Sequence, residues 1–74
     1  MQSSTMDHLD VIVRASNGQV LIQCTYCDGL MNGLYEEWYE SGQKRLECTF
    51  ANGMLVGLHT AWDETGYMYF QTVY

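Results

Sequence analysis

The chain contains no proline and very few basic residues. Of its 74 residues only three are Lys or Arg, against nine Asp or Glu, which gives a formal net charge of −6. Proteins that bind nucleic acid or anionic membranes need a patch of basic side chains to displace counterions or to contact lipid phosphates. Three bases opposed by nine acids cannot form such a patch. The composition therefore argues against direct nucleic-acid or membrane binding and favours a partner protein with a basic surface.

The sequence also lacks a long apolar run. No segment approaches the roughly 20 apolar residues of a membrane-spanning helix, and residues 1–10 (MQSSTMDHLD) have neither the basic start nor the apolar core of a signal peptide. The three cysteines are odd in number, which fits free thiols in a reducing compartment better than a disulfide framework. We therefore expect a cytoplasmic protein.

What the sequence does contain indicates one small folded domain. It is 47% hydrophobic and 14% aromatic, which is too apolar for a disordered chain. Aromatic and β-branched residues favour strands, and its seven glycines are suited to the tight turns between them. The composition predicts an all-β protein.

A shift of 24 residues aligns the sequence with itself without a gap. The shift matches Gly33 with Gly57, and Trp38 with Trp62. It also carries Gly18 onto Gly42, so a degenerate earlier copy is present. We therefore expect a flexible N-terminal segment at residues 1–9, then a repeat domain at 10–74 with copies at 10–27, 28–51 and 52–74.

Each copy has the pattern of a hairpin, with two strand-like runs separated by a polar turn that contains glycine. The predicted fold is a single extended antiparallel meander sheet of about six strands. We place these strands at residues 10–14, 19–26, 33–39, 44–50, 57–63 and 68–74.

Alternation along the strands sorts side chains onto two faces. In the middle copy this predicts one apolar face and one mixed face. The apolar face is expected to carry Leu34, Trp38, Leu46, Cys48 and Phe50, with Glu36 intruding. The mixed face is expected to carry Tyr35, Glu37, Tyr39, Arg45, Glu47 and Thr49.

The segment GLYEEWYESGQK (33–44), followed by FANG (50–53), resembles the bacterial variant of the MORN repeat. That pattern is a glycine, a pair of aromatics five and six residues on, a second glycine, a lysine, and then an aromatic before Asn-Gly or Asp-Gly. The resemblance implies stacked hairpins in one antiparallel sheet. It implies no enzyme, and it points to a protein-association module of the kind sometimes described as an antitoxin.

The cysteines, histidines and carboxylates that could be reactive are more simply interpreted as structural residues. Cys24 and Cys27 form a C-x-x-C, but residues three apart on a strand point to opposite faces, and no second pair of ligands follows. Neither His8 nor His59 has a nucleophile and base arrangement around it. A single sheet offers no cleft for paired carboxylates. We expect no catalytic residues, no metal and no cofactor.

We expect the acidic and aromatic surface of the sheet to bind a partner protein, because tyrosines anchor many interfaces. The predicted partner-binding residues are Tyr35, Glu36, Glu37, Tyr39, Glu40, Asp63, Glu64, Tyr67 and Tyr69. The leading hypothesis is a non-catalytic inhibitor or antitoxin-like binder. An alternative is an acidic nucleic-acid mimic, such as a phage anti-defence or anti-CRISPR protein, whose carboxylates replace phosphates. A second alternative is a structural self-association module.

A sheet with no covering helix leaves an apolar face exposed, which favours association. We expect a homodimer at micromolar concentration. The predicted self-association residues are Trp38, Trp62, Phe50, Phe70 and Tyr74. The terminal strand at 68–74 (MYFQTVY) is uncharged and forms an unprotected edge, so pairing of edge strands is the other possible mode.

Overall fold

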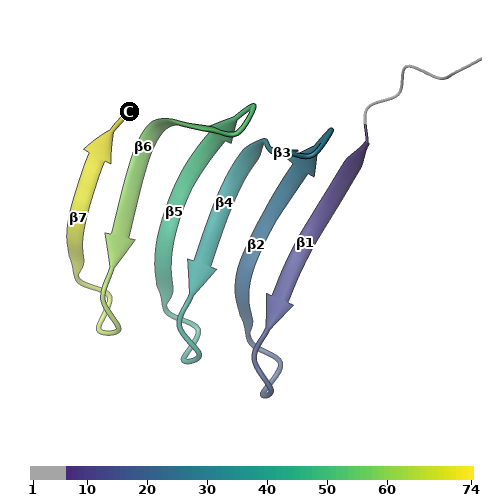
Figure 1. Cartoon of the computed structure of the whole chain (residues 1–74). Coiled ribbons are helices and arrows are strands. Elements are labelled where there is room, and N and C mark those ends of the chain that lie inside the picture. The colour runs from purple at the N-terminus through teal and green to yellow at the C-terminus, as the bar shows by residue number, and fades with distance from the viewer. Residues whose placement is uncertain (1–6) are drawn as a thin grey trace, which may run out of the picture.

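The computed structural model describes residues 7–74, which form one open antiparallel sheet (Figure 1). Its strands are β1 (His8–Arg14), β2 (Val20–Cys27), β3 (Leu30–Met31), β4 (Gly33–Trp38), β5 (Lys44–Ala51), β6 (Met54–Trp62) and β7 (Met68–Val73). They lie in the order β1-β2-β4-β5-β6-β7, and the short β3 pairs with β2. The predicted all-β meander is confirmed.

The ends of the strands differ slightly from the prediction. Most of the N-terminal segment expected at residues 1–9 falls on 1–6, outside the described residues. Strand β1 begins at His8, so the last two residues of that segment belong to the sheet. The short β3 was not predicted, because its two residues follow directly on the Asp28-Gly29 turn and are separated from β4 by Asn32.

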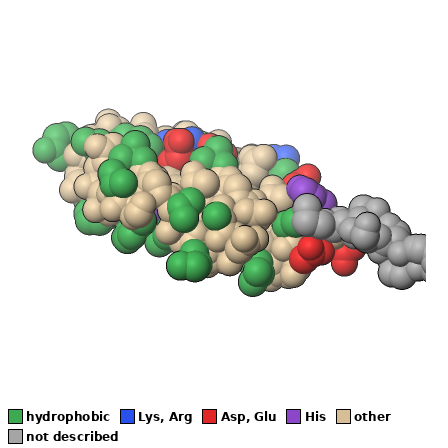
Figure 2. Space-filling view, turned by 90° about the horizontal axis from the view of Figure 1, so that it is seen from above, with side chains coloured by type: hydrophobic (Ala, Val, Ile, Leu, Met, Phe, Trp, Pro, Cys, Tyr) green, Lys and Arg blue, Asp and Glu red, His purple; other side chains and the backbone are tan. Residues whose placement is uncertain are grey.

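Within residues 7–74 the sheet is a single layer, and no other described element packs over it. Its thinnest dimension is 10 Å, and hydrophobic side chains protrude from both faces of the slab (Figure 2). Residues 7–74 contain no helix, so none there could cross a membrane. Both faces of most strands therefore stay in contact with solvent.

Tight turns join the copies at one end of the sheet. Asp28 and Asn52 have φ values of 53° and 52°, and the glycines that follow, Gly29 and Gly53, both have φ of 84°. Two successive positive φ values define the type I′ turn, whose twist matches that of the strands on either side. Asn and Asp tolerate this conformation better than other non-glycine residues, which explains the Asp-Gly and Asn-Gly pairs.

Longer turns close the hairpins at the opposite end. The backbone N–H of Tyr39 donates to the carbonyl of Gln43 at 2.9 Å, and the N–H of Gly42 donates to the carbonyl of Tyr39 at 3.0 Å. The same two bonds recur around Gly18 in the first copy and around Gly66 in the third. The backbone hydrogen bonds of this turn thus recur at intervals of 24 residues.

Neighbouring copies interlock through these turns. A Cβ atom added to Gly42 would lie 3.3 Å from Oε1 of Gln19, and one added to Gly66 would lie 3.1 Å from Oε1 of Gln43. Glycine therefore makes room for the glutamine of the preceding copy. Between the middle and third copies, the Tyr39 hydroxyl also donates to the carbonyl of Trp62 at 2.9 Å.

Strand pairing corrects the predicted division of the faces. Tyr35 lies opposite Cys48, so these side chains share a face, whereas Leu34 lies opposite Thr49. The prediction placed Cys48 with Leu34 instead. The reason is a β-bulge between β4 and β5, where the pairing shifts after Glu37. One additional residue reverses the side on which every later pair falls.

The most buried side chains are small and lie within the sheet. Cys48 is 2% exposed and Cys24 is 6% exposed, with Ala61 and Thr60 similarly buried. Cys24 and Cys48 lie in β2 and β5 on either side of β4, as expected for small structural residues, and none of the three cysteines forms a disulfide. Among residues 7–74 no large side chain is fully buried. The fold depends on its ladders and turns more than on a closed core.

Candidate protein-binding surfaces

One face of the sheet carries six aromatic or imidazole rings, and we call it the aromatic face. It carries Tyr26, Tyr35, Phe50, His59, Phe70 and Tyr74. Tyr35 and Phe50 meet edge to face with centroids 5.9 Å apart, and the His59 ring lies 5.7 Å from both Phe70 and Tyr74. Such T-shaped contacts hold the rings in fixed orientations. The face is therefore ordered even though no second layer covers it.

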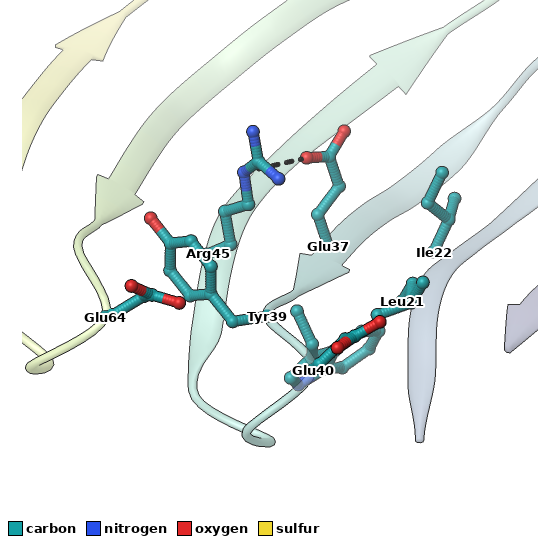
Figure 3. Close-up of a pocket in the computed structure, with 8 residues that line it drawn as sticks. Leu21, Ile22, Glu37, Tyr39, Glu40, Arg45 and Glu64 are labelled. Carbon is teal, nitrogen blue, oxygen red and sulfur yellow. Dashed lines mark ion pairs between the residues drawn. The ribbon is translucent and has the colours of Figure 1, made fainter. Parts of the chain in front are cut away.

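An open hollow of about 600 Å³ lies on this face near the hairpin turns (Figure 3). Tyr39 forms part of its wall, and the guanidinium of Arg45 lies 5.3 Å above the Tyr39 ring. The Arg45 Nε lies 3.7 Å from Oε1 of Glu37. The remaining lining residues are Leu21, Ile22, Trp38, Glu40 and Glu64. The hollow combines apolar walls, one compensated charge pair and two further carboxylates.

Tyr35 and Glu37 form the polar centre of the aromatic face. The Tyr35 hydroxyl donates to Oε2 of Glu37 at 2.6 Å. Burial raises the pKa of Tyr35, and the nearby Glu37 carboxylate raises it further. The hydroxyl therefore stays protonated at neutral pH and acts as a hydrogen-bond donor. Nothing in this pair resembles an activated nucleophile or general base.

The opposite face, which we call the tryptophan face, carries Trp38 and Trp62. Lys44 Nζ lies 5.4 Å above the Trp38 ring and forms ion pairs with Glu36 and, at 3.0 Å, with Glu47. Burial of Lys44 opposes its charge, but the hydrogen bonds to the two glutamates outweigh this and raise its pKa. Lys44 therefore compensates these two glutamates only in part, and the cluster keeps one net negative charge.

The carboxylates at the hairpin turns are used differently from one another. Asp63 accepts hydrogen bonds from the backbone N–H groups of Thr65 and Tyr67 and from the Thr65 hydroxyl, at 2.6 to 3.0 Å. The hydrogen bond from the Thr65 side chain is the main cause of the lowered pKa of Asp63. Among residues 7–74, no ion pair involves Glu40 or Glu64. These two carboxylates remain available beside the hollow.

The nine predicted partner-binding residues do not form one surface. Tyr35, Glu37 and Tyr39 lie together on the aromatic face, and Glu40 and Glu64 line the hollow beside them. Glu36 points to the tryptophan face, where Lys44 neutralises it. The others are at or beyond the last turn: Asp63 closes that turn, whereas Tyr67 and Tyr69 are strongly exposed.

The five predicted self-association residues are also divided between the two faces. Phe50, Phe70 and Tyr74 belong to the aromatic face. Trp38 and Trp62 belong to the tryptophan face, since they pair with Lys44 and Met68. The predicted common surface is therefore wrong, for the same reason that the faces were misassigned: the bulge reverses the pairing.

No arrangement suited to metal binding is present in the described part of the chain. Residues 7–74 contain no group of three or more His, Cys, Asp or Glu side chains that could hold an ion. The Nδ1 atom of His59 is buried without a hydrogen-bond partner, enclosed by Phe70 and Tyr74. Burial raises the pKa of the Cys24 and Cys48 thiols, which disfavours the reactive thiolate.

Sequence reasoning missed the roles of Lys44 and the two interlocking glutamines. Lys44 was read only as part of a motif, whereas it bridges two glutamates over a tryptophan. Gln19 and Gln43 aligned in the repeat, and each is followed one copy later by a glycine that it contacts. That recurrence of glutamine beside glycine was the available signal.

Comparisons with known proteins identify no relative. No family model, no curated protein and no solved structure matches the chain. The resemblance to the bacterial MORN variant therefore rests on the residues of the motif alone.

Proposed function

We propose that the chain is a non-catalytic protein-binding module that holds its partner on the aromatic face. The observation that carries this proposal is the uncovered layer of rings, in which Phe70 and Tyr74 are 45% and 59% exposed. Monomeric proteins rarely expose contiguous apolar patches of more than a few hundred Å² unless the patch is functional. Ordered aromatic rings are enriched among residues that dominate binding energy, because they bury much area at little entropy cost.

The charges beside the face support a partner with basic groups at the rim of the interface. Glu40 and Glu64 border the hollow without ion-pair partners within residues 7–74, and the chain as a whole carries a net charge of −6. Carboxylates at a rim act mainly on association rate and specificity. A small acidic binder of this type is suited to an inhibitory or antitoxin-like role, which agrees with the motif resemblance.

The proposal is tested by capture of a partner from native cell extract, followed by mapping of the contact. The substitution Phe70→Ser removes a ring from the aromatic face, and Leu58→Ser makes a matched change on the tryptophan face, where Leu58 is 53% exposed. We expect Phe70→Ser to weaken capture at least tenfold and Leu58→Ser to leave it within twofold. Equal loss in both variants, or loss only in Leu58→Ser, would contradict the proposal.

The nucleic-acid mimic remains an alternative with a different experimental signature. Mimicry needs carboxylates along one rim, yet Glu36 and Glu37 point to opposite faces and each is paired with a base. A mimic competes with nucleic acid for its target and loses affinity steeply with salt. An interface centred on rings resists salt. Binding of the captured partner at 50 and 500 mM salt therefore distinguishes the two.

A further inference from the structure

The two free edges of the sheet differ in how they are protected. Strand β1 (HLDVIVR) carries Asp10 and Arg14, whereas β7 (MYFQTV) carries no charged residue. Charged side chains on edge strands discourage pairing with other chains. The charges of β1 therefore disfavour pairing with a strand of another chain, whereas β7 has no such protection.

The hydrogen-bond pattern identifies which groups of β7 face outward. Tyr74 and Gly57 exchange both backbone bonds, with Tyr74 N–H to Gly57 O at 2.8 Å and the reverse at 3.0 Å. Inward-facing residues alternate along an antiparallel strand, so Thr72 also turns its backbone groups toward β6. The N–H and C=O groups of Gln71 and Val73 consequently point away from the sheet.

Large apolar side chains are exposed on both faces near this edge, on either side of the polar Gln71 and Thr72. Phe70 lies on the aromatic face, and Val73, 71% exposed, lies opposite Leu58 on the tryptophan face. A strand that is apolar on both faces is typical of the interior of a sheet. As an edge, β7 has the character of a strand that lacks a neighbour.

We propose that β7 pairs antiparallel with β7 of a second copy of the chain, about a two-fold axis at Gln71. In this register Gln71 faces Gln71 of the other copy, so that outward-facing backbone groups of the two strands meet in a hydrogen-bonded pair. The result is one continuous sheet across two chains. This contact is made by the edge of β7 and not by the plane of the aromatic face, and the inference does not depend on the proposed partner.

If two copies associate through an edge, charge favours the β7 edge over the β1 edge. Two chains of net charge −6 repel each other, and β7 is the strand edge that brings no carboxylate side chain into contact. Pairing of β7 with β1 of another copy would place Asp10 and Arg14 beside uncharged side chains and would leave an open-ended polymer. Two-fold pairing of β7 closes the assembly.

The third copy also lacks the groups that hold a following copy. Tyr39 bonds to the carbonyl of Trp62 and Gln43 contacts Gly66, but the equivalent positions in the third copy are Asp63 and Tyr67. The Asp63 carboxylate accepts hydrogen bonds from backbone N–H groups of its own turn. A further copy could not interlock with the third copy through these groups, which again favours a symmetric contact over head-to-tail addition.

The small area of this contact indicates a weak dimer. An edge of about seven residues in a single layer buries roughly 500 Å² in total, below the ~1,200 Å² of a standard stable interface. We expect a dissociation constant on the order of 100 µM.

Sedimentation equilibrium of the full chain between about 10 µM and 1 mM tests the inference. Gln71→Lys places two ammonium groups opposite each other on the axis and is expected to weaken dimerisation at least tenfold. Ile12→Lys is the matched control, because Ile12 faces outward from β1, lies on the same face and is 47% exposed. We expect this control to leave the dissociation constant within twofold. A wild-type chain that stays monomeric at 1 mM, or equal weakening by both variants, would overturn the inference.

Cross-linking provides a test that does not rely on weakened binding. In a hydrogen-bonded antiparallel pair the Cα atoms are about 5.5 Å apart, within the range of a disulfide. Gln71→Cys is therefore expected to form a covalent dimer under mild oxidation at least tenfold faster than Ile12→Cys. Equal rates would contradict the two-fold axis. Dimers that survive Gln71→Lys but are lost in Phe70→Ser would place self-association on the aromatic face instead.

Discussion

The middle and third copies share one backbone and differ in side-chain chemistry. The middle copy has charged residues at five paired positions: Glu36, Glu37, Lys44, Arg45 and Glu47. The third copy has none there, with Thr60, Ala61, Met68, Tyr69 and Gln71 instead. Strand pairing, bulge and turn are nevertheless the same in both. Glycines and turn residues determine the fold, and the strand side chains are left to determine what each copy can bind.

The largest effect is expected at the type I′ turns with which the middle and third copies begin. Substitutions there test whether the two copies have the same backbone. Gly29→Ala and Gly53→Ala each force a side chain into a φ of 84°, and each is expected to lower the free energy of unfolding by about 1 to 2 kcal/mol. Urea denaturation followed by tryptophan fluorescence measures this. The two losses should agree closely, since the copies have the same turn.

A large difference between these two variants would point to a contact rather than to backbone strain. Only Gly53 has a neighbour, with Cδ2 of Leu30 at 3.4 Å from an added Cβ. The double variant Gly53→Ala with Leu30→Ala separates the two effects.

Replacing charged residues of the middle copy by the uncharged residues of the third copy tests whether the two sets of side chains are interchangeable. Lys44→Met leaves Glu36 and Glu47 without their base and is expected to cost about 1 to 2 kcal/mol of stability in urea denaturation, because the Glu36 side chain is only 18% exposed. The triple variant Glu36→Thr, Lys44→Met, Glu47→Gln reproduces the third copy on this face. It should recover most of the loss; a triple variant less stable than Lys44→Met would show that the copies are not equivalent.

The bond between the two copies is expected to have a smaller effect. Tyr39→Phe removes the hydroxyl that donates to the Trp62 carbonyl and should lower the unfolding free energy by about 1 kcal/mol. Tyr69→Phe, at a strongly exposed position of β7, serves as the control and should change it by less than about 0.3 kcal/mol. Thermal unfolding followed by circular dichroism distinguishes the two variants. Equal shifts of the unfolding temperature would show that this hydrogen bond does not stabilise the contact between the copies.

The smallest effect is expected at Asp63, the third-copy equivalent of Tyr39. The pKa of Asp63 is lowered in the folded protein, so its contribution to stability is present above its ordinary value of 3.8 and is lost as the pH falls below that value. Asp63→Asn keeps the acceptor oxygen but removes the titration. The acid-induced loss of stability between about pH 5 and 2 should be shallower in Asp63→Asn than in Glu64→Gln, measured by urea midpoints at each pH.

Much of the fold could be predicted because the repeat is visible in the sequence. The recurrence of Gly33 and Gly57, with Asp-Gly and Asn-Gly at the start of the second and third copies, located turns and hence strands. The bulge was not predictable in the same way. It depends on how the turn after Tyr39 closes, and it has no residue signature comparable to a type I′ turn.

The extra residue of this bulge explains most of the errors in the predicted site, because it determines the face on which each side chain lies. The sequence shows which residues are aromatic, but their division between the two faces depends on the pairing register of the strands, which alternation within single strands does not determine. Trp38 and Phe50 were therefore grouped although they lie on opposite faces. Electrostatic pairing, such as Lys44 between two glutamates, follows from the same register.

The interlocking of Gln19 with Gly42 and of Gln43 with Gly66 links each copy only to its neighbour. Stability in such a structure accumulates by adjacent units, as in other linear arrays. Duplicating residues 28–51 should accordingly widen the sheet by two strand spacings, about 10 Å, without disturbing either end. The width of the sheet can thus be changed by adding copies, in evolution or by design, without changing the side chains on its faces.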